Sequence, residues 1–186
     1  QKYVPDAILS QVRQGGQNTI GGQLRKIACL FLDIRDFTQL SERFPPQATL
    51  DVLNQVFSLV QEQVLGTEGW IDKFLGDGAL VTWGAVNETS ANAENAVRAA
   101  LNISHALNAL NAQLATQGYP TINIGMGINA GPAIVGNVGA QSRMEYTSMG
   151  RTVNIASRLE QFAKQIEATL VVSSEVLNAL PEPTRK

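Results

Sequence analysis

Residues 70–83 read WIDKFLGDGALVTW, with short apolar-rich segments on both sides of the tip Gly76-Asp77-Gly78. This pattern predicts a β-hairpin that carries Asp77 at its turn. Farther upstream, the apolar run Lys26–Leu32 predicts a buried strand that ends directly before Asp33. Adjacent strands lie about 4.8 Å apart, so the two carboxylates converge on one site if these strands are neighbours.

Outward from these segments, helical and strand patterns alternate without the regular rhythm of a doubly wound sheet, which favours the α+β class with a mixed sheet and flanking helices. A helix is expected with Phe37 near its start. A longer helix is expected after Pro45-Pro46 and should end at Gly66 or Gly69; its apolar face comprises Leu50, Leu53, Val56, Phe57, Val60 and Val64. Further along the chain we expect a helix over 90–114, strands over 121–128 and 134–138, a helix over 153–164, a strand over 169–172 and a short helix capped by Ser174.

The length of 186 residues suits one domain with a short flanking segment. We expect residues 1–25 to be a connector from an upstream module, because glycine pairs interrupt a short helical pattern there, and residues 26–186 to be the domain. The net charge of -2 offers no basic surplus to attract nucleic acid. No apolar stretch approaches the roughly 20 residues of a membrane helix, and no signal peptide opens the chain. A cytoplasmic domain is therefore expected, with the membrane attachment of the full-length protein left open.

The only cysteine and the only histidine predict structural positions. Cys29 lies in the apolar run and has no second cysteine to pair with, which indicates a core position and a reducing compartment. His105 falls in a helical pattern far along the chain, where a surface or half-buried position is expected. No catalytic thiol is expected.

The two aspartates and the segment after Asp33 suit metal and phosphate chemistry. Mg²⁺ takes carboxylates and substrate phosphates as ligands, which fits Asp33 and Asp77; a helix N-cap and a turn former are their structural alternatives. A helix that starts near Phe37 would offer the backbone N–H groups of Phe37 and Thr38 to phosphate oxygens, whereas the Asp36 carboxylate would repel them unless it turns away.

Asn154 and Arg158 are four residues apart in a helical pattern and therefore share a face. An amide beside a guanidinium suits the orientation of a ribose and the stabilisation of phosphate charge. The same pair equally suits an ordinary helix surface.

Six segments together resemble the ordered motifs of class III adenylyl and guanylyl cyclase catalytic domains. In chain order they read FLDIRDFT with SE following (31–38 and 41–42), KFLGDG (73–78), GMGINAG (125–131), VGNVG (135–139), RMEYT (143–147) and GRTVNIASRLE (150–160). The resemblance covers residues 26–172. It implies a palm-like (ferredoxin-like), mainly antiparallel sheet flanked by helices, and conversion of ATP to cyclic AMP and pyrophosphate.

The resemblance also implies roles for the matching residues. Asp33 and Asp77 would hold two divalent metal ions, Mg²⁺ or Mn²⁺, with help from the backbone carbonyl of Ile34. Asn154 would orient the ribose, and Arg158 would stabilise the charge on the α-phosphate. In the family these two sets come from opposite subunits, so the implied partners are ATP, a second copy of the chain and an upstream regulatory module.

Lys73 and Thr147 fall where the family reads the purine. Lysine only donates hydrogen bonds, whereas a threonine hydroxyl can also accept, so the pair complements the N1 acceptor and the N6 amine of adenine. Guanine presents an N–H donor at N1, and facing it with lysine leaves an unsatisfied contact that costs about 1–3 kcal/mol. The Lys/Thr pair resembles bacterial-type adenylyl cyclases that carry threonine rather than aspartate.

Two alternatives and three departures from the family pattern accompany this interpretation. A guanylyl cyclase keeps the fold but changes the substrate. The second alternative is a different class of protein, a non-catalytic nucleotide-binding or dimerisation module in a signalling protein. Asp36 stands where glycine is common in the family, and Arg151 replaces a frequent aspartate or asparagine. The family's terminal strands, with a lysine that contacts the outer phosphates, would lie beyond Lys186, so reduced or absent activity of this segment is expected.

Overall fold

A mainly antiparallel sheet forms the centre of the computed structural model, which describes residues 21–87, 89–140 and 143–181. Its strands run in the order β2-β3-β1-β4-β5, and β6 pairs in parallel with β4 beside this path. Their bounds are Gly21–Ile34 (β1), Trp70–Leu75 (β2), Gly78–Trp83 (β3), Ile124–Ala140 (β4), Arg143–Met149 (β5) and Leu170–Val172 (β6). The α+β class and the predicted hairpin at residues 70–83 are confirmed.

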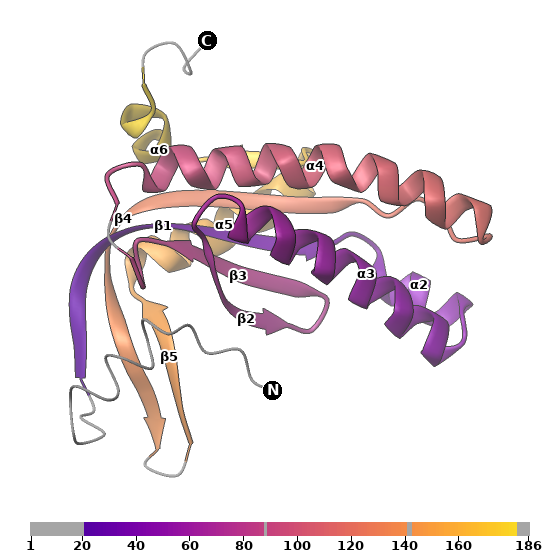
Figure 1. The fold of residues 1–186 in the computed structure, drawn as a ribbon, viewed down its shortest axis with the longest axis horizontal. Helices are drawn as coiled ribbons and strands as arrows, with labels where there is room; N and C mark the ends of the chain where they lie inside the picture. Colours follow the sequence, from indigo (N-terminus) through magenta and orange to yellow (C-terminus); the bar gives the residue numbers. More distant parts are fainter. Residues whose placement is uncertain (1–20, 88, 141–142, 182–186) are drawn as a thin grey trace.

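The two longest strands, β1 and β4, pair antiparallel from Gly21↔Asn137 to Ile34↔Ile124 and curve together through the molecule (Figure 1). β1 begins at Gly21, five residues before the predicted start at Lys26. The two strands predicted over 121–128 and 134–138 form one continuous strand. Residues 129–133 stay extended because they pair with residues 25–29 of β1, a constraint that the local sequence does not carry.

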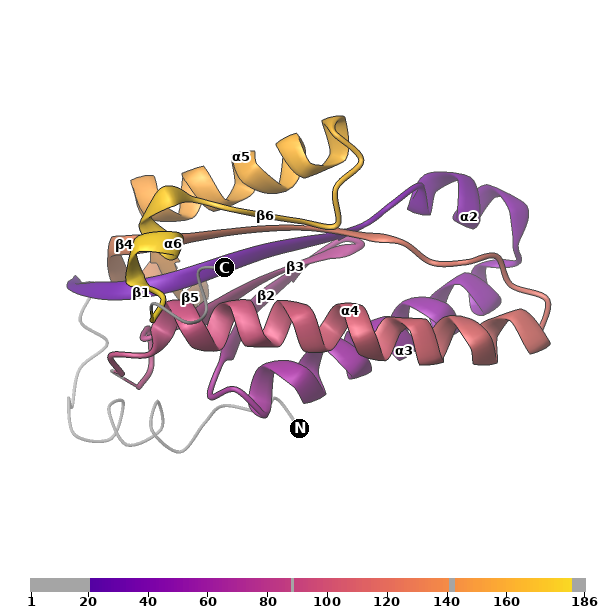
Figure 2. The same ribbon diagram turned by 90° about the horizontal axis from the view of Figure 1, so that it is seen from above.

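Helices cover both faces of the sheet. Figure 2 shows α3 (Pro46–Leu65) and α4 (Asn92–Thr116) on one side and α5 (Arg151–Gln165) on the other. Two short helices, α2 (Phe37–Arg43) and α6 (Ser174–Ala179), lie after β1 and after β6. The cap of α6 is Ser173, which accepts the backbone N–H of Val176, and not Ser174 as predicted.

The larger core lies between the sheet and the pair α3/α4. In α3 the buried row is Val52, Val56, Val60 and Val64, because side chains four residues apart stack along one helix face. The predicted apolar face was partly wrong: Leu50 is 47% exposed, and Val52 was missed. Phe57 stacks on Phe74 of β2 with ring centroids 4.3 Å apart.

A smaller core lies between the sheet and α5, and Cys29 is buried in it as predicted. Gly127 of β4 permits close packing of this helix, since a Cβ there would collide with the backbone of Ala156, Leu159 and Glu160. The register of α5 against the sheet therefore depends on a residue without a side chain. His105 is exposed on α4, in agreement with the sequence.

Residues 21–25, assigned to the predicted connector, belong to β1, and residues 1–20 lie outside the described part of the chain. Within the described ranges, no helix combines the length and the apolar character that a membrane crossing requires.

Candidate active site

Asp33 and Asp77 lie side by side where β1 and the β2–β3 hairpin end. Asp33 pairs in register with Gly78, and the Ile34 N–H donates to the Asp77 carbonyl at 3.3 Å. Gly78 allows this approach, because a Cβ there would come within 3.0 Å of the Asp33 carboxylate and closer still to the carbonyl of Leu32. The convergence predicted from neighbouring strands is therefore present.

The end of β1 and the β2–β3 turn, which carry Asp33 and Asp77, form an acidic corner of the molecule. Burial and then the negative charge of Asp77 raise the pKa of Asp33 above its ordinary value. Glu160 of α5 lies near enough to feel the same charges: burial and then Asp33 raise its pKa as well. A cation placed among these carboxylates would relieve their repulsion.

The donor set fits a metal site that the substrate completes. In the part of the chain that the structure describes, no three His, Cys, Asp or Glu side chains come close enough to hold a metal ion together. Two carboxylates and a backbone carbonyl are the kind of partial ligand set that Mg²⁺ uses when phosphate oxygens and water supply the rest. Asp33, Asp77 and the Ile34 carbonyl suit that arrangement.

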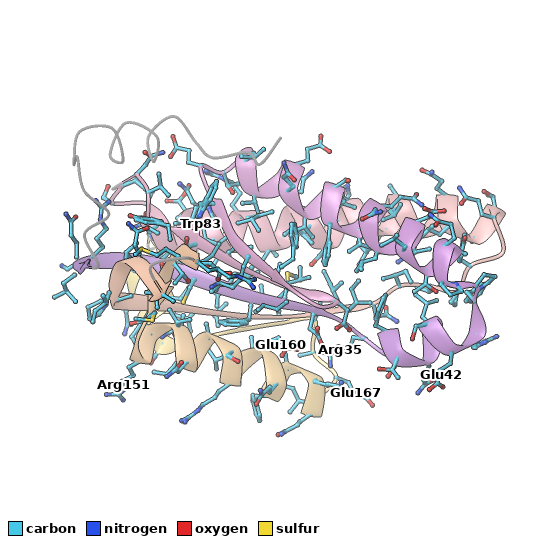
Figure 3. All side chains as sticks on the ribbon, turned by 90° about the horizontal axis from the view of Figure 1, so that it is seen from below. Arg35, Glu42, Trp83, Arg151, Glu160 and Glu167 are labelled. Carbon is cyan, nitrogen blue, oxygen red and sulfur yellow. The ribbon has the colours of Figure 1, made fainter. Side chains whose placement is uncertain are left out.

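Two basic side chains border the acidic corner. The charges of Lys164 and Arg35 oppose the rise in the Asp33 pKa. Figure 3 shows Arg35 near Glu160 and Glu167, at the end of α5 opposite Arg151. Arg35 also donates to the Ala168 carbonyl at 2.7 Å, which ties the end of β1 to the loop before β6.

The N-terminus of α2 follows directly from this corner. Asp36 precedes the helix in a left-handed conformation (φ 55°), its carbonyl accepts the Leu40 N–H at 3.1 Å, and its side chain makes no capping hydrogen bond. The helix N-cap is thus Asp36 and not Asp33. Asp77, in contrast, stands in the tight turn between β2 and β3, so the turn-forming role holds for it. The backbone of Phe37 and Thr38 opens the helix, and its binding of phosphate stays a prediction.

Lys73 and Thr147, far apart in sequence, meet at a carboxylate that the sequence analysis did not single out. The Thr147 hydroxyl lies 2.7 Å and 3.0 Å from the two oxygens of Asp72, and the Lys73 ammonium lies 3.5 Å from one of them. The backbone N–H of Ser148 donates to Asp72 at 2.9 Å, and Lys73 also contacts Glu145 at 3.1 Å. The Asp72 side chain is only 2% exposed.

The backbone explains how Asp72 reaches this position. The β2–β3 register shifts between Ile71 and Lys73, so Asp72 lies at a bulge, and bulges re-aim side chains. β2 and β5 are the two ends of the strand path, yet Asp72 joins them, because the curved sheet brings its ends together. Burial raises the pKa of Asp72, and the hydrogen bonds from Thr147 and Ser148 oppose that rise.

Asn154 and Arg158 lie on α5 as predicted, and both side chains are exposed. Within the described residues neither side chain makes a hydrogen bond or an ion pair. Both are therefore accessible to groups outside the chain.

These motifs and this fold agree with a match to a known family. Residues 22–185 match the family described as the adenylate and guanylate cyclase catalytic domain. The chain belongs to this family. Over 94% of its length, the cyclase domain is 35% identical to adenylate cyclase 1 of Rhizobium meliloti (strain 1021), of which it covers 26%. The domain thus spans about a quarter of that relative's length.

Two solved structures resemble the cyclase domain about equally. The adenylyl cyclase CyaB from P. aeruginosa is 36% identical, with a TM-score of 0.81 over 86% of this chain and 82% of the other. The guanylyl cyclase Cya2 is 34% identical, with a TM-score of 0.81 over 88% and 82%. One of these proteins is described as an adenylyl cyclase and the other as a guanylyl cyclase. The choice between adenine and guanine therefore has to be argued from the side chains.

Proposed function

We propose that this cyclase domain is an adenylyl cyclase, which converts ATP to cyclic AMP and pyrophosphate as a homodimer. The observation that carries the choice of base is the meeting of Lys73 and Thr147 on one carboxylate. A charged donor beside a hydroxyl that can accept complements the N1 and N6 groups of adenine. The similarity to the adenylate cyclase of Rhizobium meliloti supports the same choice.

The reaction forms a bond from the ribose 3′-oxygen to the α-phosphorus and breaks the bond to pyrophosphate. Asp33, Asp77 and the Ile34 carbonyl would hold two divalent cations, Mg²⁺ or Mn²⁺, whose charge favours the 3′-alkoxide and neutralises phosphate oxygens. The backbone of Phe37 and Thr38 would bind the phosphate chain at the start of α2. No side chain is assigned as a general base.

Asn154 and Arg158 would act on the substrate held by the opposite subunit. Asn154 would orient the ribose so that its 3′-oxygen lies in line with the leaving group. Arg158 would stabilise the negative charge that develops on the α-phosphate. Their exposure, without partners in the described residues, supports this assignment.

A second copy of the chain is the partner we propose for two exposed apolar groups. One lies around the β2–β3 hairpin and the end of α3, and the other lies on β1, β4 and β5. Large apolar side chains exposed this close together favour an interface. The first group is Leu65, Phe74 and Leu75; the second is Leu24, Ile134, Val138 and Met149.

The domain would work as one part of a longer signalling protein. We propose that an upstream regulatory module precedes the catalytic domain, in line with the small share of adenylate cyclase 1 that this chain covers. A guanylyl cyclase is the second candidate, because the likeness to Cya2 is nearly as close as that to CyaB.

Turnover of ATP and GTP, each with Mg²⁺ and with Mn²⁺ and at several protein concentrations, tests the proposal. We expect cyclic AMP to form faster than cyclic GTP, with a specific activity that rises with protein concentration as dimers form. A higher kcat/KM for GTP than for ATP would overturn the choice of base. The shared site would be overturned if the specific activity stays constant down to protein concentrations at which light scattering shows monomers.

A further inference from the structure

Because of Asp72, the Thr147 hydroxyl can act toward a purine only as a hydrogen-bond acceptor. A hydroxyl has one proton to donate and two lone pairs, whereas an ionised carboxylate only accepts. At 2.7 Å from Asp72, Thr147 must therefore direct its proton at the carboxylate. Only lone pairs remain for the substrate.

We propose that Asp72 makes this site select adenine by holding Thr147 as an acceptor, an inference that rests on the proposed adenylyl cyclase function. With Lys73 opposite N1, Thr147 faces the group on C6 of the purine. Adenine carries an amine there, which donates to the lone pairs of Thr147. Guanine carries a carbonyl oxygen, which would face those lone pairs without a proton between them. A threonine free to rotate could donate to that oxygen, so the carboxylate and not the hydroxyl alone creates the selectivity.

The surroundings of Asp72 hold its carboxylate in place. Its side chain is 2% exposed, and the backbone N–H of Ser148 donates to Oδ2 at 2.9 Å, the oxygen that lies farther from Thr147. Lys73 lies 3.5 Å from Oδ1. The buried Asp72 carboxylate thereby orients Thr147, the acceptor that faces C6 of the purine, and lies beside Lys73, the donor that faces N1.

The substitution Asp72→Asn tests the proposal. The Ser148 N–H requires an oxygen at the Oδ2 position, so the new amide nitrogen takes the Oδ1 position and donates to Thr147. The Thr147 proton is then released toward the purine. We expect the ratio of kcat/KM for ATP to that for GTP to fall about tenfold or more, since a polar contact at C6 is at stake.

Two comparisons separate selection of the base from a structural role. In a Thr147→Val background, Asp72→Asn should leave the ratio unchanged, because no hydroxyl remains to be oriented. Glu145→Gln removes the other carboxylate beside Lys73. This side chain is 54% exposed, and the substitution should also leave the ratio unchanged. A purely structural role for Asp72 would lower kcat/KM for both nucleotides alike and keep their ratio constant.

Nucleotide analogues test the same point with the unaltered protein. N6-methyl-ATP keeps a donor on C6, whereas the triphosphate of 6-methoxypurine riboside carries an acceptor there with a methyl group of similar size. Both keep N1 as an acceptor for Lys73. We expect the first analogue to compete with ATP at least tenfold better than the second.

The outcomes distinguish the two claims. If the unaltered protein prefers GTP, the proposed function fails. If it prefers ATP but neither Asp72→Asn changes the ratio nor the two analogues differ, the function stands and the role of Asp72 is refuted. If Asp72→Asn does not fold, as judged by thermal unfolding, the analogue pair decides.

Discussion

Asp33 and Asp77 are brought together by backbone pairing: the N–H that follows Asp33 donates to the Asp77 carbonyl at 3.3 Å. Burial and the charge of Asp77 raise the pKa of Asp33. The fold therefore maintains a repulsive pair of carboxylates at the end of β1 and at the β2–β3 turn. Sites of this kind trade stability for function, and a bound cation would offset the repulsion.

Asp77→Asn removes one negative charge from this pair. We expect cyclase activity to fall at least about a hundredfold, because a proposed metal ligand is lost. Without divalent cations, the melting temperature should stay the same or rise, since the repulsion is gone. Mn²⁺ should raise the melting temperature of the unaltered protein and not that of the variant. Asp51→Asn, on the exposed face of α3, is the control and should behave like the unaltered protein.

Mixing Asp77→Ala with Arg158→Ala tests the shared site. Each variant alone should be inactive, but a mixed dimer combines one intact set of aspartates with one intact arginine. With free subunit exchange, half of the dimers are mixed and each holds one intact site, so roughly a quarter of the full activity should return. A mixture of Asp33→Ala with Asp77→Ala should stay inactive, because both changes affect the same half of the site. Subunit exchange without any recovery in the first mixture contradicts the model of two chains per site.

Gly127→Ala should weaken the packing of α5 on the sheet. The added Cβ meets the backbone of Ala156, Leu159 and Glu160, which cannot move independently of the helix. We expect the free energy of unfolding to fall by about 1–3 kcal/mol, as in other overpacked cores. Activity should fall further than stability explains, because α5 carries Asn154 and Arg158. Gly21→Ala, where a Cβ meets nothing within 4 Å, is the control for urea unfolding curves; an unchanged midpoint for Gly127→Ala would contradict the packing argument.

Cys29 should be an internal probe of unfolding. Burial raises the pKa of its thiol from 9.0 to about 12, and the side chain is inaccessible in the smaller core. Labelling with a thiol reagent at pH 8 should therefore proceed only through opening of the structure, and its rate should follow urea. Labelling of the native protein at the rate of a free cysteine would show that α5 does not cover the strand.

The raised pKa of the Cys29 thiol predicts that the free energy of unfolding falls at alkaline pH. The folded state keeps the proton of Cys29 between pH 9 and pH 12, while the unfolded state releases it. The contribution to stability is complete below the unfolded pKa and is lost as the pH rises toward the folded pKa, by at most about 1.4 kcal/mol per pH unit. Comparing Cys29→Ala with the unaltered protein by urea unfolding at pH 8 and pH 10 measures it; parallel losses in both proteins would exclude it.

Local patterns were sufficient for the elements that carry the acidic corner. The apolar run before Asp33 and the Gly-Asp-Gly tip around Asp77 are short-range signals. They gave the strand and the turn that the structure has, although β1 continues through Asp33 to Ile34. The Asn154 and Arg158 pair followed from helical spacing in the same way. Local patterns failed where pairing overrides them: residues 129–133 are extended because β1 lies beside them, and Leu50 is exposed because α3 turns its row of valines inward.

The sequence by itself determined the family motifs and the hairpin, since each depends on residues that are close along the chain. Only the tertiary structure placed Asp72 against Thr147, 75 residues away and at the opposite end of the strand path. The physical reason is the curvature of the sheet together with the bulge at Asp72. Neither can be read from neighbouring residues, because both arise from how distant strands pair.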